Sequence, residues 1–304
     1  MVTLGGYLIM KKAIFIYNPF SGNRSNINNL DFVLEYALKH DTYLIPYRIE
    51  GLNARLYEIL ENNEFDFAII SGGDGTLNSI ANILLQNKFN LPIGIIPSGT
   101  CNDFALSLGI PGNIEKSLDI IFSGNIMEVD VGLINDDKYF LNSCAGGLFV
   151  DVSFNTNSEL KKNFGPLAYY LKALSEVTHM KSFNLKLNTD TGVIEEDALL
   201  FFILNGTYGG GFANLINDAD ISDGLMDIIL IKKCAHIDLA NLFFNVLTQE
   251  SVNNKYALRL KTKQCEIEGY NNVQLSVDGE KGPMLPVKIR FLHRALSVFV
   301  KTNT

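Results

Sequence analysis

The chain has 304 residues, of which 47% are hydrophobic and 19% are charged, and its formal net charge at pH 7 is −8. This length favours two domains, and no segment approaches the roughly 20 continuous apolar residues that a membrane span requires. The negative charge argues against nucleic acid as the main partner, because neutralising phosphates requires a basic surface.

The N-terminal stretch MVTLGGYLIMKK places its lysines after the apolar residues, which is the opposite of the order in a secretory signal. Met10 precedes Lys11 and Lys12 and resembles a true start, so Met1 and Met10 both remain candidates for the first residue. The cysteines form no CxxC pair, and we expect free thiols in a cytoplasmic protein. They are Cys101, Cys144, Cys234 and Cys265.

The first part of the chain alternates short β-branched and aromatic runs with helix-patterned segments, which predicts a parallel α/β sheet. We expect strands at residues 13–17, 43–49, 66–70 and 93–96. We expect helices at residues 27–39, 53–62, 76–87 and 113–122, with asparagine or threonine turns capping the last three. Ligands of such sheets bind at the carboxyl ends of the strands.

From about residue 127, strand-like runs follow one another with few helices between them, which predicts a mainly antiparallel second domain. The expected helices there lie near residues 157–180 and 236–247. We therefore divide the chain into an α/β domain, residues 1–125, and a β-rich domain, residues 126–304, and we allow the last strand to return to the first domain.

The segment YALRLKTK carries three alternating basic residues that would share one face of a strand. They are Arg259, Lys261 and Lys263. A solvated sheet face and a membrane-docking patch both fit this pattern.

Glycine-containing turns follow the predicted strands: NPFSGN at 18–23, GGDGTLN at 72–78 and PSGTCND at 97–103, with YGGG at 208–211 further along. The first three should gather on one edge of the α/β sheet. Glycine lets backbone amides approach phosphate oxygens, and a following helix N-terminus favours an anion. A single such turn is more simply a tight turn capped by Asp74, but three on one edge favour an anion site at Gly72, Gly73, Gly75 and Thr76.

Several familiar motifs are absent from the sequence, including the Walker A pattern, GxGxxG after the first strand and the GxSxG elbow. The four histidines are isolated, so a histidine zinc site or a catalytic triad has little support. Carboxylates therefore remain as the reactive groups, and Mg²⁺ couples such oxygen ligands to phosphate. The candidates are Asp74, Asp103, Asp130, Asp220, Asp223, Asp278 and Glu280, each of which also fits a cap or turn.

Asp278 lies in the segment QLSVDGEKG, at the end of an apolar strand. One interpretation is a DG hairpin turn. The other is a base that accepts the proton of a hydroxyl group during phosphoryl transfer. The residues alone leave both open.

The set NPFSGN, GGDGTLN, PSGTCNDFA, VDVG, DGLMD and VDGE, in this order, resembles the diacylglycerol kinase catalytic-domain family, and in particular its soluble bacterial lipid kinases. The resemblance extends from about residue 12 to 300. The GGDGT loop alone is less specific, because NAD kinases and phosphofructokinases carry a similar one. VDGE separates the lipid kinases.

The resemblance implies a two-domain enzyme with ATP on the α/β domain, the lipid in the β-rich domain and catalysis between them. The implied phosphate contacts are Gly72, Gly73, Asp74, Gly75 and Thr76, with Asn18, Ser21 and Thr100 nearby. The implied organisers of the catalytic Mg²⁺ are Asp74, Asp103 and Asp130. Asp278 would be the base, supported by Glu280, and a structural Mg²⁺ would bind Asp223 and the carbonyl of Leu225.

The implied activity is ATP- and Mg²⁺-dependent phosphorylation of the hydroxyl group of diacylglycerol or a related lipid, with peripheral membrane contact during turnover and room for a homodimer. NAD kinase and a catalytically silent lipid-binding regulatory protein are the alternatives. The sequence departs from the family pattern at Asn23, Ser79 and Leu106. It determines neither the lipid, whose pocket depends on residues such as Phe201, Phe202 and Phe212, nor the oligomeric state.

Overall fold

The computed structural model describes residues 10–21, 29–50, 54–148, 150, 182–210, 215–216, 218–247, 255–269 and 273–302. The helix expected near 157–180 lies outside the described residues, as do Met1, Asn23, Gly211 and Phe212. The chain divides into two compact units. Unit 1 comprises residues 1–129 and 295–304, and unit 2 comprises residues 130–294.

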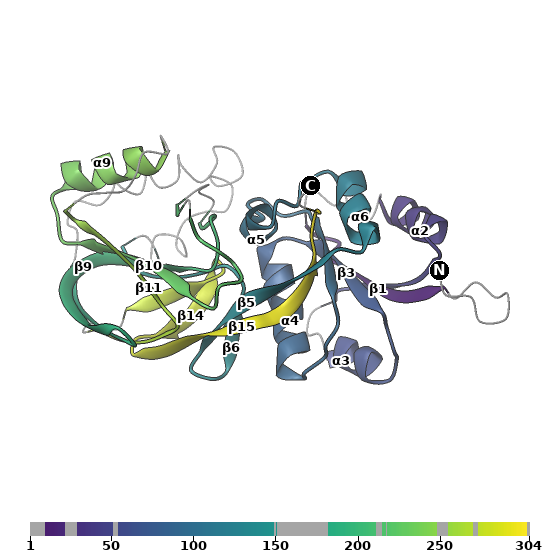
Figure 1. Cartoon of the computed structure of the whole chain (residues 1–304), viewed down its shortest axis with the longest axis horizontal. Coiled ribbons are helices and arrows are strands. Elements are labelled where there is room, and N and C mark those ends of the chain that lie inside the picture. Colours follow the sequence, from purple (N-terminus) through teal and green to yellow (C-terminus); the bar gives the residue numbers. More distant parts are fainter. Residues whose placement is uncertain are drawn as a thin grey trace. The chain divides into compact units, whose positions relative to one another are not determined.

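Unit 1 is built on a parallel sheet, as predicted (Figure 1). Its strands are β1 (Lys11–Tyr17), β2 (Thr42–Arg48), β3 (Phe67–Gly72) and β4 (Ile93–Pro97), in the order β4-β3-β1-β2. All residues of β3 and β4 are buried, which is typical of parallel strands covered on both faces. The end of β15 (Val287–Phe299) extends this sheet, where Val298 pairs with Ile93.

Helices cover both faces of this sheet (Figure 1). They are α2 (Leu30–Lys39), α3 (Ala54–Glu61), α4 (Asp74–Gln86), α5 (Asp103–Ser107) and α6 (Ile114–Ser123). Side chains of α2 and α6, including Val33 and Leu118, share one cluster with Phe15 and Ile69 of the sheet. Asn113 caps α6, as expected, by accepting a 2.9 Å hydrogen bond from the amide of Lys116.

Two features of unit 1 differ from the prediction. Helix α4 begins at Asp74, earlier than expected, and its N-cap is Gly73, whose φ is −93°. Helix α5 was not expected at all, because five residues are too few to show a helical period and its N-cap Asn102 has a left-handed φ of 56°.

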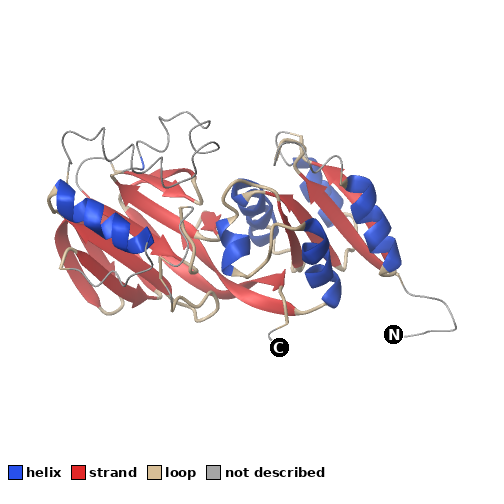
Figure 2. Ribbon diagram, turned by 90° about the horizontal axis from the view of Figure 1, so that it is seen from above, coloured by secondary structure: helices blue, strands red, loops and turns tan. Residues whose placement is uncertain are grey.

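Unit 2 consists mainly of antiparallel strands, which confirms the prediction (Figure 2). The sheet order is β14-β13-β7-β9-β8-β12-β15, while β10 pairs with β9 and β11, and β6 pairs with β5. The strands are β5 (Ile126–Ile134), β6 (Lys138–Phe140), β7 (Ser143–Gly147), β8 (Phe183–Thr189), β9 (Gly192–Leu204), β10 (Met226–Lys232), β11 (Ala257–Thr262), β12 (Gln264–Gly269), β13 (Gln274–Val277), β14 (Glu280–Met284) and β15.

Strand β9 contributes to two hydrophobic clusters of unit 2. Phe201 and Ile203 belong to the larger cluster, and Leu200 and Leu204 belong to a second. This alternation follows the two-residue period of a strand. Leu239 and Leu242 of α9 (His236–Leu247), the predicted second helix, pack in the second cluster.

Candidate active site

Three predicted glycine-containing loops meet at the carboxyl ends of β1, β3 and β4. The amide of Asn18 donates to the carbonyl of Ser71 (3.0 Å), and the amide of Ser98 donates to the carbonyl of Gly72 (2.9 Å). The side-chain Nδ2 of Asn18 also donates to Oγ1 of Thr76 (3.1 Å). The expectation that these loops gather on one edge of the sheet is confirmed.

Glycine is required where two of these loops touch. A Cβ added to Gly73 would lie 2.9 Å from Cα of Gly99, and one added to Gly99 would lie 2.6 Å from Cα of Gly73. A Cβ on Gly72 would lie 2.4 Å from Cβ of Thr76. The backbones are therefore packed at a separation that no larger residue permits.

The N-terminus of α4 points to anion binding at this edge. The first amides of a helix have no intrahelical acceptor, and Gly73 supplies no side-chain cap. These amides and the helix dipole favour a negative group. Among the other predicted contacts, Ser21 donates its amide to the carbonyl of Asn18 (3.3 Å), and Thr100 is exposed in the loop after β4.

Asp74 and Asp103 begin α4 and α5, and hydrogen bonds connect these two helix starts. Oδ1 of Asp74 accepts a 3.3 Å bond from the amide of Phe104. Burial raises the pKa of the Asp74 carboxyl above its usual value of 3.8, while the amides of Phe104, Asp103 and Asn102 act in the opposite direction. Asp103 is itself 7% exposed.

The raised pKa of Asp74 predicts a pH-dependent stability. The folded state binds the Asp74 proton more tightly than the unfolded state, so this group's contribution is present below 3.8 and is lost as pH rises through the folded pKa. Relative to wild type, Asp74→Asn should gain stability as pH rises from about 4 to 7. Thermal unfolding curves across that range measure the difference, with Asp31→Asn on the exposed surface of α2 as the charge control. Wild-type and Asp74→Asn melting curves that stay parallel across this range would contradict it.

Asp278 lies in a hairpin turn, and the turn also fixes its carboxylate. The φ values of Asp278 and Gly279 are 47° and 81°, the left-handed pair of a type I′ turn between β13 and β14. The carboxylate accepts three amide hydrogen bonds, from Leu141 to Oδ2 (2.7 Å) and from Asn142 (2.9 Å) and Ser143 (2.8 Å) to Oδ1. The hairpin interpretation is thus confirmed, and it leaves Asp278 an oriented carboxylate. Glu280 follows as an exposed residue at the start of β14.

Asp130 lies fully buried in unit 2, where both of its carboxylate oxygens have protein partners. Oδ1 accepts from the amide of Arg294 (2.7 Å) and lies 3.0 Å from Nδ1 of His293. Oδ2 accepts from the amide of Gly224 (2.5 Å). These bonds connect β5 to β15 and to the loop before β10.

The loop predicted to hold a structural Mg²⁺ is ion-paired with β11. Asp223 accepts the amide of Leu225 on Oδ1 (2.9 Å), and its Oδ2 lies 3.3 Å from Nζ of Lys261. Lys261 also lies 3.5 Å from Oδ2 of the buried Asp227, which Arg259 contacts at 2.8 Å. A metal ion bound to Oδ2 of Asp223 would compete with the Lys261 ammonium group for that oxygen. Within the described ranges, no three His, Cys, Asp or Glu side chains are grouped as a metal site.

The strand-face prediction for the basic segment is confirmed for Arg259 and Lys261, which alternate on β11. It is wrong for Lys263, which lies in the turn after that strand. Arg259 contacts Asp218 at 2.6 Å in addition to Asp227. Neighbouring acids therefore neutralise much of the charge that a membrane-docking patch would need.

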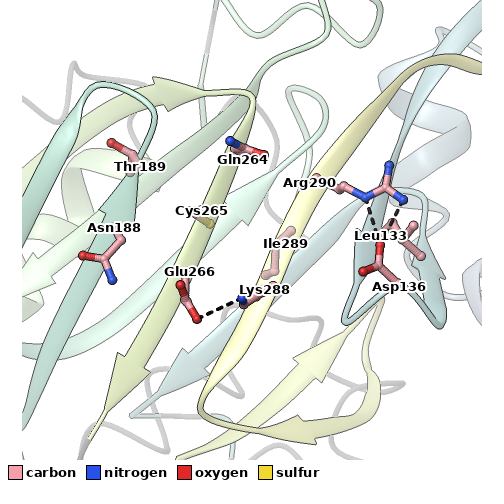
Figure 3. Close-up of a pocket in the computed structure, with 10 residues that line it drawn as sticks. All are labelled: Leu133, Asp136, Asn188, Thr189, Gln264, Cys265, Glu266, Lys288, Ile289 and Arg290. Atoms are coloured by element: carbon pink, nitrogen blue, oxygen red, sulfur yellow. Dashed lines mark hydrogen bonds and ion pairs between the residues drawn. The ribbon is translucent and has the colours of Figure 1, made fainter.

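A pocket of about 440 Å³ lies on unit 2, and none of its lining residues is a predicted site residue (Figure 3). Its rim carries ion pairs between Lys288 and Glu266 (3.5 Å) and between Arg290 and Asp136 (2.9 Å). The cations are paired with carboxylates, so the pocket is a polar, ion-paired face of the sheet. It contributes nothing to the candidate active site.

Sequence reasoning missed the groups that hold Asp278. The donors are main-chain amides of residues 141–143, and main-chain groups carry no residue-type signal. It also missed Asn205, whose side chain is 2% exposed and contacts the same segment. The oxygens Oδ1 of Asn142 and Asn205 are buried and have no hydrogen-bond partner among the residues that the structure describes.

Residues 12–134 match the family model of the diacylglycerol kinase catalytic domain. Residues 145–300 match the model described as the YegS C-terminal NAD kinase beta sandwich-like domain. A diacylglycerol kinase of Staphylococcus aureus strain MRSA252 is 34% identical over 295 residues, which cover 96% of this chain and 93% of that protein. The chain belongs to the diacylglycerol kinase family.

Solved structures of this family share the fold. A diacylglycerol kinase from Bacillus anthracis strain Sterne has a TM-score of 0.80 at 26% identity, covering 97% of this chain and 99% of that chain. A second crystal structure from the same strain gives a TM-score of 0.83 with the same identity and coverage. Of the departures from the family pattern, Ser79 is exposed on α4 and Leu106 is 39% exposed on α5. Within the described part of the chain, no helix is long and apolar enough to cross a membrane.

Proposed function

We propose that this member of the diacylglycerol kinase family transfers the γ-phosphoryl group of ATP, with Mg²⁺, to the hydroxyl group of diacylglycerol or a related lipid. The observation that carries the proposal is the carboxylate of Asp278, which three amides hold in one orientation within the VDGE turn. A base for a hydroxyl acceptor must be ionised and oriented, and amide donors favour both conditions.

Unit 1 supplies the phosphate-binding part of the proposal. The N-terminus of α4, which has no side-chain cap, would direct its first amides at phosphate oxygens, next to the close contact of Gly73 with Gly99. Asn18 and Thr76, which are hydrogen-bonded to each other, border the same loops. Phosphoryl transfer depends mainly on positioning and charge stabilisation, which such amides provide.

Asp74 and Asp103 would hold the catalytic Mg²⁺, which when bound would neutralise charge on the phosphate oxygens. Carboxylates at the start of two helices are suitable oxygen donors for this hard cation. Asp130 would belong to the network around this catalytic ion. Asp223 and the carbonyl of Leu225 would form a separate, structural metal site. In both cases the ion would compete with hydrogen bonds or ion pairs that these carboxylates make within unit 2.

The proposed step moves one proton and one phosphoryl group. The lipid hydroxyl oxygen forms a bond to the γ-phosphorus as the bond from that phosphorus to the β–γ bridging oxygen breaks. The hydroxyl proton passes to the carboxylate of Asp278, and ADP leaves with the bridging oxygen. Glu280, two residues further along the chain, would support the base. During turnover the protein would contact the membrane only peripherally.

One assay separates this function from its alternatives. The protein is incubated with Mg²⁺, ATP and either dispersed diacylglycerol or NAD, and the products are identified by mass spectrometry. We expect a phosphorylated lipid. Phosphorylated NAD alone would support the NAD kinase alternative, and binding of both ATP and lipid without phosphorylation of diacylglycerol, related lipids or NAD would support the silent lipid-binding alternative.

A further inference from the structure

Asn205 follows β9 and makes three hydrogen bonds from a buried position. Its Nδ2 donates to the carbonyl of Leu141 (2.8 Å) and to the carbonyl of Asp130 (2.7 Å). Its main-chain amide donates to the carbonyl of Asn142 (2.9 Å). The residue therefore binds two consecutive carbonyls of the segment after β6.

The same segment holds the carboxylate of Asp278 through its amides. Leu141 and Asn142 each accept a bond from Asn205 on their carbonyl and donate a bond to Asp278 from their amide. The amide of Asp278 in turn donates to the carbonyl of Ser143 (2.8 Å). Residues 141–143 are thus held between Asn205 and Asp278.

The side chain of Asn205 contributes through its nitrogen. Its Oδ1 is buried and has no hydrogen-bond partner in the described part of the chain, which destabilises the folded state. Its Nδ2 donates to two main-chain carbonyls, and without this side chain each of them would lose that hydrogen bond. An aspartate here would place an anionic oxygen against those two carbonyl oxygens, so isosteric replacement does not preserve the arrangement.

We propose that Asn205 is a positioning residue for the carboxylate of Asp278, acting through the turn of residues 141–143. This inference rests on the proposed function for the assignment of Asp278 as the base. The bond from Nδ2 to the carbonyl of Asp130 extends the same network to β5, whose Asp130 carboxylate fixes Gly224 and Arg294. One side chain therefore connects the 141–143 turn to β5.

The test is Asn205→Ala in the full chain, with Thr262→Val as the matched control. Thr262 is buried in unit 2, and its hydroxyl donates to the carbonyl of Gln264 (2.8 Å) and contacts Asp190, so the control loses hydrogen bonds away from Asp278. We expect Asn205→Ala to lower kcat roughly 100-fold with little change in KM for ATP, because a displaced base is costly to the chemical step. Hydrogen exchange of peptides covering 141–143 should accelerate in this variant and stay unchanged in the control.

A second variant keeps the test decisive if Asn205→Ala fails to fold. Asn205→Ser retains one donor, so its kcat should fall less than 100-fold below that of wild type, while exchange at 141–143 should still be faster than in wild type. Unchanged exchange at 141–143, or equal losses of kcat in Thr262→Val, would overturn the inference. If wild type shows no turnover, the proposed function fails by itself, and the exchange data still decide whether Asn205 orders the segment that binds Asp278.

Discussion

Asp278→Asn should lower kcat about 10²- to 10⁴-fold, the range that a general base contributes. Asparagine keeps the shape of the side chain and is compatible with the left-handed φ of 47°. It cannot accept the hydroxyl proton. The new NH₂ group must also face an amide donor at one end, so we expect a stability loss of about 1–2 kcal/mol as well.

The matched control for this prediction is Asp136→Asn. Asp136 is also an aspartate of unit 2 in a left-handed turn, with a φ of 56°, but its carboxylate pairs with Arg290 at the surface. Initial rates of lipid phosphorylation measure kcat, ATP titration measures nucleotide affinity, and melting curves measure stability. Turnover in Asp278→Asn equal to that of Asp136→Asn would remove Asp278 as the base.

Gly99→Ala should weaken ATP binding at least tenfold and destabilise unit 1 by about 1–3 kcal/mol, the usual cost of overpacking. The added methyl group would lie 2.6 Å from Cα of Gly73 and 2.8 Å from Oδ1 of Asn102. Asn102 bonds to the amide of Gly99 (2.8 Å) and to its carbonyl (3.0 Å), so it cannot move away without losing both bonds. The two glycine loops must separate, which would displace Gly73 at the N-terminus of α4, where we propose that phosphate binds.

Gly112→Ala is the control for this second prediction. A methyl group added to Gly112 meets nothing within 4 Å, so this variant tests the general effect of replacing glycine outside a helix or strand. Isothermal titration with ATP and Mg²⁺ gives the affinity, and thermal unfolding gives the stability. An ATP affinity that is the same in Gly99→Ala and Gly112→Ala would contradict the assignment of this loop to phosphate binding.

Much of the fold could be predicted because its signals are local. The apolar run at 93–96 became β4 (Ile93–Pro97), and the capping pattern at Asn113 became the start of α6. The carboxyl ends of parallel strands lie on the same edge of a sheet, so contact between the Asn18 and Gly72 loops could also be expected. The sequence did not predict helix α5, because this helix is shorter than two helical turns.

The contacts of the candidate site could be predicted only where they depend on neighbouring residues. The Asp278 turn follows from the DG pair, but its carboxylate binds amides more than 130 positions earlier in the chain. Likewise, alternation places Arg259 and Lys261 on one face of β11, whereas their partners Asp218, Asp223 and Asp227 depend on a long-range strand pairing. Long-range pairing of main-chain groups leaves no periodic signal.

The separation between the Asp278 turn and the amides that bind it also bears on how the chain folds. A two-residue hairpin closes within microseconds, but the carboxylate is oriented only after β13 pairs with β7, which lies far earlier in the chain. Under the proposed function, in which unit 1 binds ATP, a chain recovering from denaturant should regain nucleotide affinity earlier than phosphotransfer. Activity would then return only once β13 has paired with β7, later than the helical circular dichroism signal.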